Sequence, residues 1–250
     1  DLVFKGGPCL SKCYDVIPRF SEDVDLGIPY EHATEGMRKR IKASVVGSAE
    51  QLGLAIPNLG ETRSRREYNR YEISLPAADD ALVVETAVMT PASPYLERPI
   101  QSFVGQFAAG RGQERFVKRY GLDRFVVKAN SLDRTFVDKV FALCDYHLAG
   151  EGSTYRQSRH IYDLFKLLDH VSLDDGMREL FAKVRSQREP SARCPSAKNG
   201  VDLGFLLREI MDEDVYRSDY ERVTTPLLYE DVPYDLAATS IGRIARFLER

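Results

Sequence analysis

The sequence predicts a protein of the α/β (α+β) class, with a mixed β-sheet lobe followed by a helical C-terminal lobe. In the first third of the chain short extended runs alternate with helical stretches, whereas from about Ser131 onward the spacing is helical. The chain has 250 residues, 43 % apolar and 29 % charged, which is typical of a globular protein with a sizeable core. We expect an α/β domain over residues 1–125 and a helical domain over residues 126–250, with the functional cleft between them.

The N-terminal lobe is expected to begin with a strand over Leu2–Lys5, and since the chain opens inside this strand we expect further residues to precede it. The Gly6-Gly7 pair then turns the chain into a helix over about residues 8–14, because proline is favourable in the first helical turn. Apolar residues alternate with Asp23 and Asp25, which is the period of a strand. The remaining predicted elements of this lobe are a helix over 32–54 and strands over 68–75 and 81–89.

The helical lobe is predicted from capping residues and helical spacing. Ser131 is expected to cap a helix that ends near Leu148, and Ser153 one that ends near His170. Residues 189–196 carry two prolines and small polar residues, and are expected to form a loop. Three further helices are predicted at about residues 174–188, 202–213 and 235–249.

Charge and cysteine content exclude several classes of protein. The formal net charge is −3, so no global positive field would draw the chain to nucleic acid or to an anionic membrane. The four cysteines form no CxxC pair and are too few for a disulfide framework, which favours a reducing cytoplasm. No apolar run approaches 18 residues and no signal peptide is evident, so we expect no membrane partner.

Two aspartates and two glycines form the first candidate site. Side chains on the same side of a strand recur every second residue at about 3.3 Å per residue, so Asp23 and Asp25 could converge on one Mg²⁺. A solvated strand end is the alternative. The helix after Gly6-Gly7 could offer backbone amides to a phosphate, although such a pair can also be a simple turn. In combination, the order of elements predicts a phosphate site and a metal site at one sheet edge.

Glu85 is a third candidate metal ligand. It interrupts the apolar run over residues 81–89, where an unpaired charge would be costly. It therefore needs a partner, which could be a metal ion shared with the two aspartates. The alternatives are a strand end that reaches solvent, or a salt bridge to one of Arg63, Arg65, Arg66 and Arg70.

These motifs resemble the AbiEii/AbiGii toxin family of the nucleotidyltransferase-fold superfamily. The resemblance rests on Phe4-Lys5-Gly6-Gly7 with its short helix, and above all on Arg19-Phe20-Ser21-Glu22-Asp23-Val24-Asp25-Leu26. It continues in two later helices, Arg134 to Leu143 and Arg159 to Leu164, and spans roughly residues 2–170. The resemblance implies a nucleotidyltransferase-like sheet lobe that binds a nucleoside triphosphate with Mg²⁺ or Mn²⁺.

The resemblance also implies roles for individual residues. Asp23, Asp25 and Glu85 would hold the metal, and Gly6, Gly7, Ser11 and Lys139 would contact the triphosphate. Asp163 would help to place Lys139 or the acceptor. On a helical wheel Lys139 falls just outside an apolar stripe and Asp163 lies on the polar side, so that Arg159 and Asp163 could also be an ordinary surface ion pair. Pro8 replaces the Ser or Thr that usually follows Gly-Gly in the family, and so removes phosphate donors.

The expected function is transfer of a nucleoside monophosphate to an acceptor hydroxyl, implied to be the 3′ end of tRNA, by the toxin of a toxin–antitoxin or abortive-infection pair. Two basic clusters could bind RNA or could be solvated faces, and no antitoxin-binding surface is visible. A nucleotide-binding or partner-binding module that has lost turnover is the alternative, and a protein or small-molecule acceptor is a third possibility. The basic clusters are Arg63/Arg65/Arg66/Arg70 and Arg111/Arg115/Lys118/Arg119.

Overall fold

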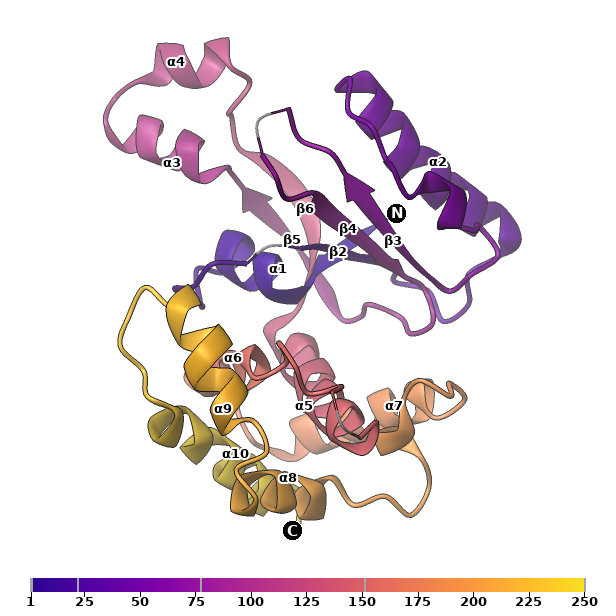
Figure 1. Cartoon of the computed structure of the whole chain (residues 1–250), viewed down its shortest axis with the longest axis vertical. Coiled ribbons are helices and arrows are strands. Elements are labelled where there is room, and N and C mark those ends of the chain that lie inside the picture. The colour runs from indigo at the N-terminus through magenta and orange to yellow at the C-terminus, as the bar shows by residue number, and fades with distance from the viewer. Residues whose placement is uncertain (1, 22, 77, 151, 250) are drawn as a thin grey trace.

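A computed structural model describes residues 2–21, 23–76, 78–150 and 152–249. It contains a six-stranded mixed sheet and a group of helices below it (Figure 1). The predicted fold class, a mixed-sheet lobe followed by a helical lobe, is confirmed. No helix within these described residues is long and apolar enough to cross a membrane.

The sheet has the strand order β3-β4-β2-β1-β6-β5. The β1/β6 and β2/β4 pairs are parallel, and the other three pairs are antiparallel. The central strands β1 and β2 are therefore flanked by two hairpins. The strands are β1 (Val3–Lys5), β2 (Val24–Gly27), β3 (Tyr68–Ile73), β4 (Leu82–Ala87), β5 (Tyr95–Ile100) and β6 (Phe125–Asn130).

Two helices cover one face of the sheet. Val45 of α2 (Glu35–Gln51) packs with Leu26 and other apolar residues of β2, β3 and β4. Cys9 of α1 (Gly6–Cys13) packs with Phe4 and with residues of β5 and β6. Phe4 and Leu26 are partners in the antiparallel β1/β2 register, so their side chains lie on the same face. Asp25 precedes Leu26 and points to the opposite face.

The helical lobe has one large apolar core around α5. Residues from all its main helices take part, and Leu10 of α1 joins them, so the core continues up to the sheet lobe. Ser131 caps α5 as predicted, with its hydroxyl accepting from the Arg134 amide. The helices are α5 (Leu132–Leu148), α6 (Arg159–Leu167), α7 (Asp175–Arg188), α8 (Leu203–Asp212), the single turn α9 (Arg217–Asp219) and α10 (Tyr234–Leu248).

Two distant parts of the chain meet just before β2. Arg19 forms an isolated antiparallel bridge with Leu228, and the Phe20 amide donates to the Leu227 carbonyl. The Tyr229 amide in turn donates to the Pro18 carbonyl. The C-terminal region therefore holds the segment that leads into β2.

Several predicted bounds are wrong. The first helix starts at Gly6, two residues before the expected position, and Gly6 itself has a left-handed φ of +71° at the turn from β1. The helix expected from Ser153 begins only at Arg159, because residues 152–158 form turns that include two left-handed residues. Four elements were not predicted from the sequence: β5, β6 and the short helices α3 (Phe103–Gly110) and α4 (Glu114–Arg119). The expected domain division at residues 125/126 falls at the first residue of β6 and stays a prediction.

Candidate active site

Asp25 lies directly against the first residue of α1. Gly6 has a φ of +71°, and a Cβ atom there would lie 1.8 Å from Asp25 Oδ2. A Cβ atom on Gly7 would lie 2.5 Å from Ser21 Oγ and 2.8 Å from Arg19 Nη2. Only glycine permits such close approaches. The structure thus brings the Gly-Gly pair together with the Asp-x-Asp strand, as the order of elements predicts.

The start of α1 offers few free donors to a phosphate. In a helix that begins at Gly6, the amides of residues 9 and 10 are used in i→i−4 bonds. The amides that the helix itself leaves without an i−4 partner are those of Gly6 and Gly7, and Pro8, the next residue, has no N–H. The Ser11 hydroxyl donates to the Pro8 carbonyl at 3.2 Å, so its proton is used within the helix. The predicted contact between Ser11 and phosphate stays a prediction.

A row of charged residues crosses the sheet on the face opposite α1 and α2. Lys5 of β1 is the register partner of Asp25 of β2, and Asp25 is the partner of Glu85 of β4. Glu85 is in turn the partner of Arg70 of β3. Asp25 and Glu85, which we call the sheet carboxylates, are therefore side by side, with a cationic residue on each of the two strands that flank them, β1 and β3.

The charge of the sheet carboxylates is only partly compensated. Burial raises the pKa of Asp25 to about 6; Lys5 opposes this rise, whereas repulsion by Glu85 adds to it. Glu85 Oε1 accepts a hydrogen bond of 2.7 Å from the Tyr68 hydroxyl. Among the described residues, this tyrosine is its partner rather than any of the four arginines that the sequence analysis considered.

Asp23, the other carboxylate of the Asp-x-Asp pair, lies near a cation of α6. Its carboxylate lies 3.9 Å from Arg159 Nη2, and both side chains are partly exposed. Its negative charge also contributes to the raised pKa of Asp25, after burial and the charges of Lys5 and Glu85. Within the described residues, no three or more His, Cys, Asp or Glu side chains are grouped so that they could hold a metal ion. The three-carboxylate metal site therefore stays a prediction.

A buried ion cluster lies between the helical lobe and the segment before β2. Asp163 of α6 accepts from Arg19 Nε at 2.7 Å and from Arg19 Nη2 at 2.8 Å. It also accepts from Lys139 Nζ of α5 at 2.6 Å. All three residues are buried. We call Arg19, Lys139 and Asp163 the interhelical triad.

The triad differs from what the helical wheel indicated. The structure buries both Lys139 and Asp163, and it does not show the alternative surface pair of Arg159 with Asp163, since Asp163 is bound by Arg19 and Lys139. Burial alone would raise the pKa of Asp163, but the two cations hold that pKa well below its usual range. Arg19 is the residue whose pairing the sequence analysis missed. Its only signal was its place in the family-like string before Asp23.

An aromatic pair lies beside the two charged clusters. The rings of Tyr146 and His160 are stacked, with centroids 6.0 Å apart and planes 14° apart. Burial raises the pKa of Tyr146, and the charges of Glu85 and Asp25 raise it further. Burial and Lys139 lower the pKa of His160 well below its usual value, and among the described residues its Nδ1 atom has no hydrogen-bond partner. His160 is therefore neutral near pH 7.

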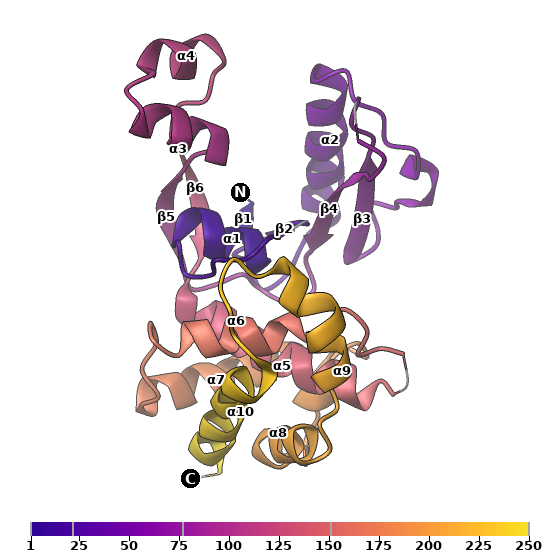
Figure 2. The ribbon, with the colours of Figure 1, turned by 60° about the vertical axis from the view of Figure 1, so that its left-hand side comes forward.

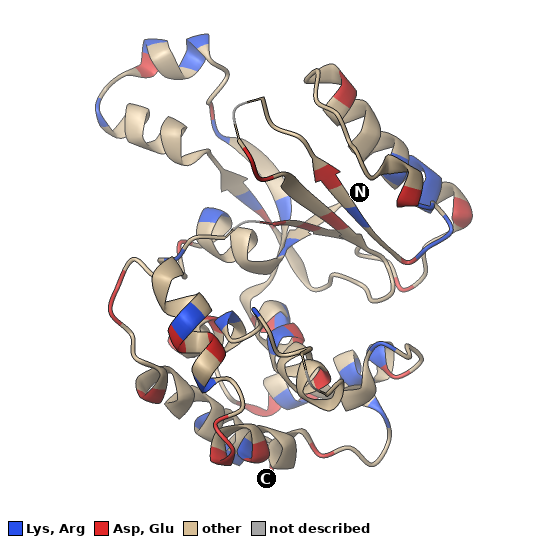
Figure 3. Cartoon of the chain, in the orientation of Figure 1, with Lys and Arg blue, Asp and Glu red and all other residues tan. Residues whose placement is uncertain are grey.

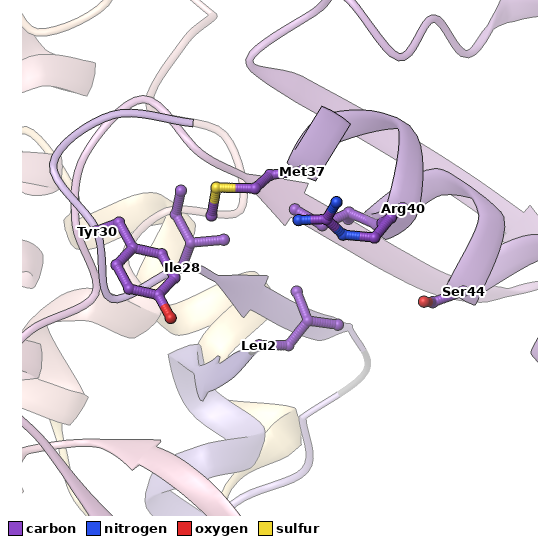
Figure 4. A pocket seen from close by; sticks show the side chains of 7 residues that line it. Leu2, Ile28, Tyr30, Met37, Arg40 and Ser44 are labelled. Atoms are coloured by element: carbon purple, nitrogen blue, oxygen red, sulfur yellow. The ribbon is translucent and has the colours of Figure 1, made fainter. Parts of the chain in front are cut away.

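Two hollows lie near these elements. The one in Figure 4, of about 300 Å³, lies between α2 and the start of the sheet and contains none of the predicted site residues. Its walls are Leu2, Ile28, Tyr30, Met37, Arg40, Ile41 and Ser44. The other, of about 560 Å³, lies between α1 and α3, and Ser11 is one of its walls.

Comparison with known proteins adds one finding. A family model described as "Nucleotidyl transferase AbiEii toxin, Type IV TA system" matches residues 1–240 of the chain. A search of curated proteins finds no match. The family match extends well beyond residue 170, where the resemblance of the sequence motifs ends, and includes most of the helical lobe.

Proposed function

Since the chain belongs to the AbiEii family of nucleotidyl transferase toxins of type IV toxin–antitoxin systems, we propose that it transfers a nucleoside monophosphate from a nucleoside triphosphate to an acceptor hydroxyl at the 3′ end of tRNA. The acceptor oxygen forms a bond to the α-phosphorus while the bond from that phosphorus to the bridging oxygen breaks. Pyrophosphate leaves, and the hydroxyl proton passes to water.

One observation carries this proposal. The carboxylate of Asp25 lies on the backbone of Gly6 and is in register with Glu85. A phosphate held by the Gly6 and Gly7 amides would therefore lie next to two carboxylates. Nucleotidyl transfer needs this arrangement, because the triphosphate and the cations that balance its charge must be held in a fixed position relative to the acceptor hydroxyl.

The donor set suits a divalent cation. Carboxylate oxygens are the ligands that Mg²⁺ and Mn²⁺ prefer, and Asp23, Asp25 and Glu85 would supply them. Burial is the main cause of the raised pKa of Asp25, and the charges of Glu85 and Asp23 add to it, so a cation bound here would stabilise the ionised carboxylate. When bound, such a cation neutralises the charge that develops on the phosphates and favours ionisation of the attacking hydroxyl.

Lys139, a member of the interhelical triad, would be the cation that the chain itself supplies to the triphosphate. Lys139 uses one of its three donors on Asp163, so two remain for triphosphate oxygens. Its positive charge lowers the pKa of Asp25, although by less than the effects of burial, Lys5 and Glu85 on that pKa. This indicates that the side chains of Lys139 and Asp25 lie near each other. Asp163, held from its other side by Arg19, would fix the position of Lys139.

The toxin would act in the cytoplasm, where tRNA and nucleoside triphosphates are found. A cognate antitoxin follows from the type IV toxin–antitoxin family. The protein would be toxic because a tRNA whose 3′ end carries extra nucleotides cannot be charged with an amino acid.

The test is incubation of the purified protein with total tRNA, Mg²⁺ and each of the four α-labelled nucleoside triphosphates. We expect label to enter tRNA from at least one of them. It should not enter from a γ-labelled triphosphate, nor enter tRNA whose terminal ribose has been oxidised by periodate. An Asp23→Asn/Asp25→Asn double variant should be inactive, whereas an Asp212→Asn variant, altered far along the chain in α8, should retain activity. Absence of label from tRNA with all four triphosphates would refute the proposal.

A further inference from the structure

Helices α3 and α4 form an arm that projects from the sheet. They lie between β5, an edge strand, and β6, and Figures 1 and 2 show them extending away from both the sheet and the helical lobe. Figure 2 places this arm and α2 on opposite sides of the sheet lobe. We define the arm as residues 101–124, all of which the structure describes.

The arm exposes large aromatic side chains. Phe107 is 63 % exposed, Tyr120 57 % and Phe103 53 %. Val104 and Phe116 are exposed beside them. Exposed apolar side chains gathered on one projecting element are typical of a binding surface rather than of an inert face.

The arm is also basic in an acidic protein. Residues 101–124 include five Lys or Arg and two Asp or Glu, a net charge of +3. Since the whole chain carries −3, the remaining residues together carry −6. Figure 3 shows basic residues on α4 and on the loop that leads to it. A polyanion that approaches this protein would therefore be drawn to the arm.

The cations and the exposed rings are interleaved. The Arg111 guanidinium lies 4.5 Å from the centroid of the Phe107 ring, and that of Arg119 lies 5.6 Å from the Tyr120 ring. The Lys12 ammonium of α1 lies 3.7 Å from the Phe103 ring. Surfaces that bind single-stranded nucleic acid have this composition, because bases stack on the rings while cations contact the phosphates.

We propose that the arm binds the single-stranded end of the acceptor RNA, an inference that rests on the proposed function for the identity of the acceptor. Aromatic residues and Arg are enriched at protein interfaces as well, and it is the net positive charge of the arm in an otherwise acidic chain that favours a polyanion over a protein partner. Here each of the three exposed rings Phe103, Phe107 and Tyr120 carries a cation.

The hollow of about 560 Å³ lies between the arm and α1, the helix that begins at Gly6. Its walls come from α1 and the residues just after it, from the end of β5 and from the arm, and their charged members are Lys12, Arg124 and Asp15. The first residue of the same helix, Gly6, touches Asp25. An RNA strand that leaves the arm through this hollow would therefore run along α1 toward the sheet carboxylates.

The second basic cluster provides a matched control. Arg63 donates to the Thr62 carbonyl at 3.0 Å and also to Gly60, and Arg66 donates to the Glu61 carbonyl at 3.0 Å. These guanidinium groups are used within their own loop. Together with Arg65 they allow a triple substitution that removes the same charge as one on the arm.

The experiment measures binding of fluorescent tRNA by anisotropy over a range of NaCl concentrations. The charge variant is Arg111→Gln/Arg115→Gln/Arg119→Gln. We expect its Kd for tRNA to rise at least tenfold near 100 mM salt, and the slope of log K against log salt to fall by about 2, because each phosphate contact contributes about 0.7 to 0.9. The control Arg63→Gln/Arg65→Gln/Arg66→Gln should stay within about twofold of wild type.

The aromatic variant is Phe107→Ala/Tyr120→Ala. We expect its Kd for tRNA to rise about tenfold with an unchanged salt slope, since stacking carries no charge. Thermal stabilisation by nucleoside triphosphate should equal that of wild type in both arm variants. As a measurement that needs no variant, ultraviolet crosslinking of 4-thiouridine-labelled RNA to wild-type protein should modify peptides from residues 101–128.

The outcomes separate the two proposals. If wild type labels tRNA while the arm variants bind tRNA normally and crosslinks fall elsewhere, the proposed function stands and the inference is overturned. If the arm variants lose tRNA binding but wild type labels no tRNA, the arm is an RNA-binding surface and the proposed function fails. If wild type binds no RNA, the inference is overturned.

Discussion

The sheet carboxylates and the interhelical triad are both charged clusters in one candidate active site, yet they are built in different ways. In the triad, one carboxylate accepts three hydrogen bonds from two cations, and all three residues are buried. In the sheet, two carboxylates lie side by side, and burial raises the pKa of Asp25 to about 6. In the triad the carboxylate is fully paired by the protein's own cations, which leave one positive charge over, whereas the sheet carboxylates would be stabilised by a further cation.

Because of this difference, the two clusters should contribute to the stability of the fold with opposite signs. The triad should stabilise the fold and position Lys139. The sheet carboxylates should destabilise the fold in the absence of a bound cation. Substitutions in the two clusters should therefore change stability in opposite directions, even where both abolish activity.

The largest effect is expected from Asp163→Asn, which leaves Arg19 and Lys139 buried without their carboxylate. Removal of one member of a buried ion cluster costs about 3 to 5 kcal/mol in the free energy of unfolding. Urea denaturation monitored by circular dichroism measures this loss. As a control, Lys139→Met leaves the pair of Arg19 with Asp163 intact and should cost only about 1 kcal/mol. Equal losses in the two variants would show that the cluster is not organised around Asp163.

We expect Asp25→Asn to increase the free energy of unfolding, the opposite of the effect of Asp163→Asn. The pKa of Asp25 in the folded protein, about 6, lies above its ordinary value of 3.8. The protonated form is therefore favoured by folding, and wild type loses this stability as the pH rises through about 6. At pH 7 the variant should be more stable by up to about 3 kcal/mol, at about 1.4 kcal/mol per pKa unit.

The pH dependence of this gain is its control. Urea denaturation of both proteins should give a difference near zero below pH 4 that grows between pH 4 and pH 6, while nucleotidyl transfer stays abolished in the variant. A variant that is less stable than wild type at pH 7 would mean that the charge of Asp25 is compensated in the folded protein.

A third substitution tests the contact between the glycine turn and the sheet. Gly6→Ala would introduce a Cβ atom 1.8 Å from Asp25 Oδ2 at a φ of +71°. Left-handed backbone and overpacking each cost about 1 to 2 kcal/mol, so we expect a loss of about 2 kcal/mol or more, together with loss of transfer. Gly47→Ala in α2, where no atom lies within 4 Å of the new Cβ, should instead stabilise the protein by about 0.5 kcal/mol. Equal stabilities of the two variants in thermal denaturation would contradict this contact.

Addition of Mg²⁺ tests whether a cation completes the sheet carboxylates. At a concentration ten times its Kd, a ligand that binds only the folded state stabilises it by about 1.4 kcal/mol. We expect this gain in wild type and in Lys139→Met, and its absence in Asp25→Asn. Differential scanning calorimetry with and without Mg²⁺ provides the comparison, with K⁺ at equal ionic strength as the control. A gain that persists in Asp25→Asn would place the cation elsewhere.

The two clusters also differ in how far the sequence could predict them. The glycine turn and Asp25 are close in the chain, and the period-two pattern of β2 together with the order of elements was sufficient to bring them together. Arg19 and Asp163 are 144 residues apart. Asp163 is charged, and a helical wheel assigns a charged residue to the solvent side unless its buried partner is known.

The missed elements have a similar explanation. β5 contains Pro99 and the charged pair Glu97 and Arg98, and as an edge strand it lacks the apolar alternation of a half-buried strand. Helices α3 and α4 have eight and six residues, too few for a clear helical period. Their exposed aromatic residues follow no core pattern, and this is the property that marks the arm as a binding surface.

The smallest effect is expected from Tyr68→Phe, which removes the hydrogen bond to Glu85 Oε1. Burial and the adjacent Glu85 raise the pKa of Tyr68 above its usual value, so its hydroxyl remains protonated and donates near neutral pH. Loss of one such bond costs about 1 kcal/mol, and less here because Glu85 is only partly buried and water can replace the hydroxyl. Urea denaturation should show this loss without Mg²⁺ and a smaller one with Mg²⁺, since a bound cation would satisfy the same carboxylate. The exposed Tyr155→Phe serves as the control, and a Tyr68→Phe loss that is unchanged by Mg²⁺ would separate Glu85 from the metal site.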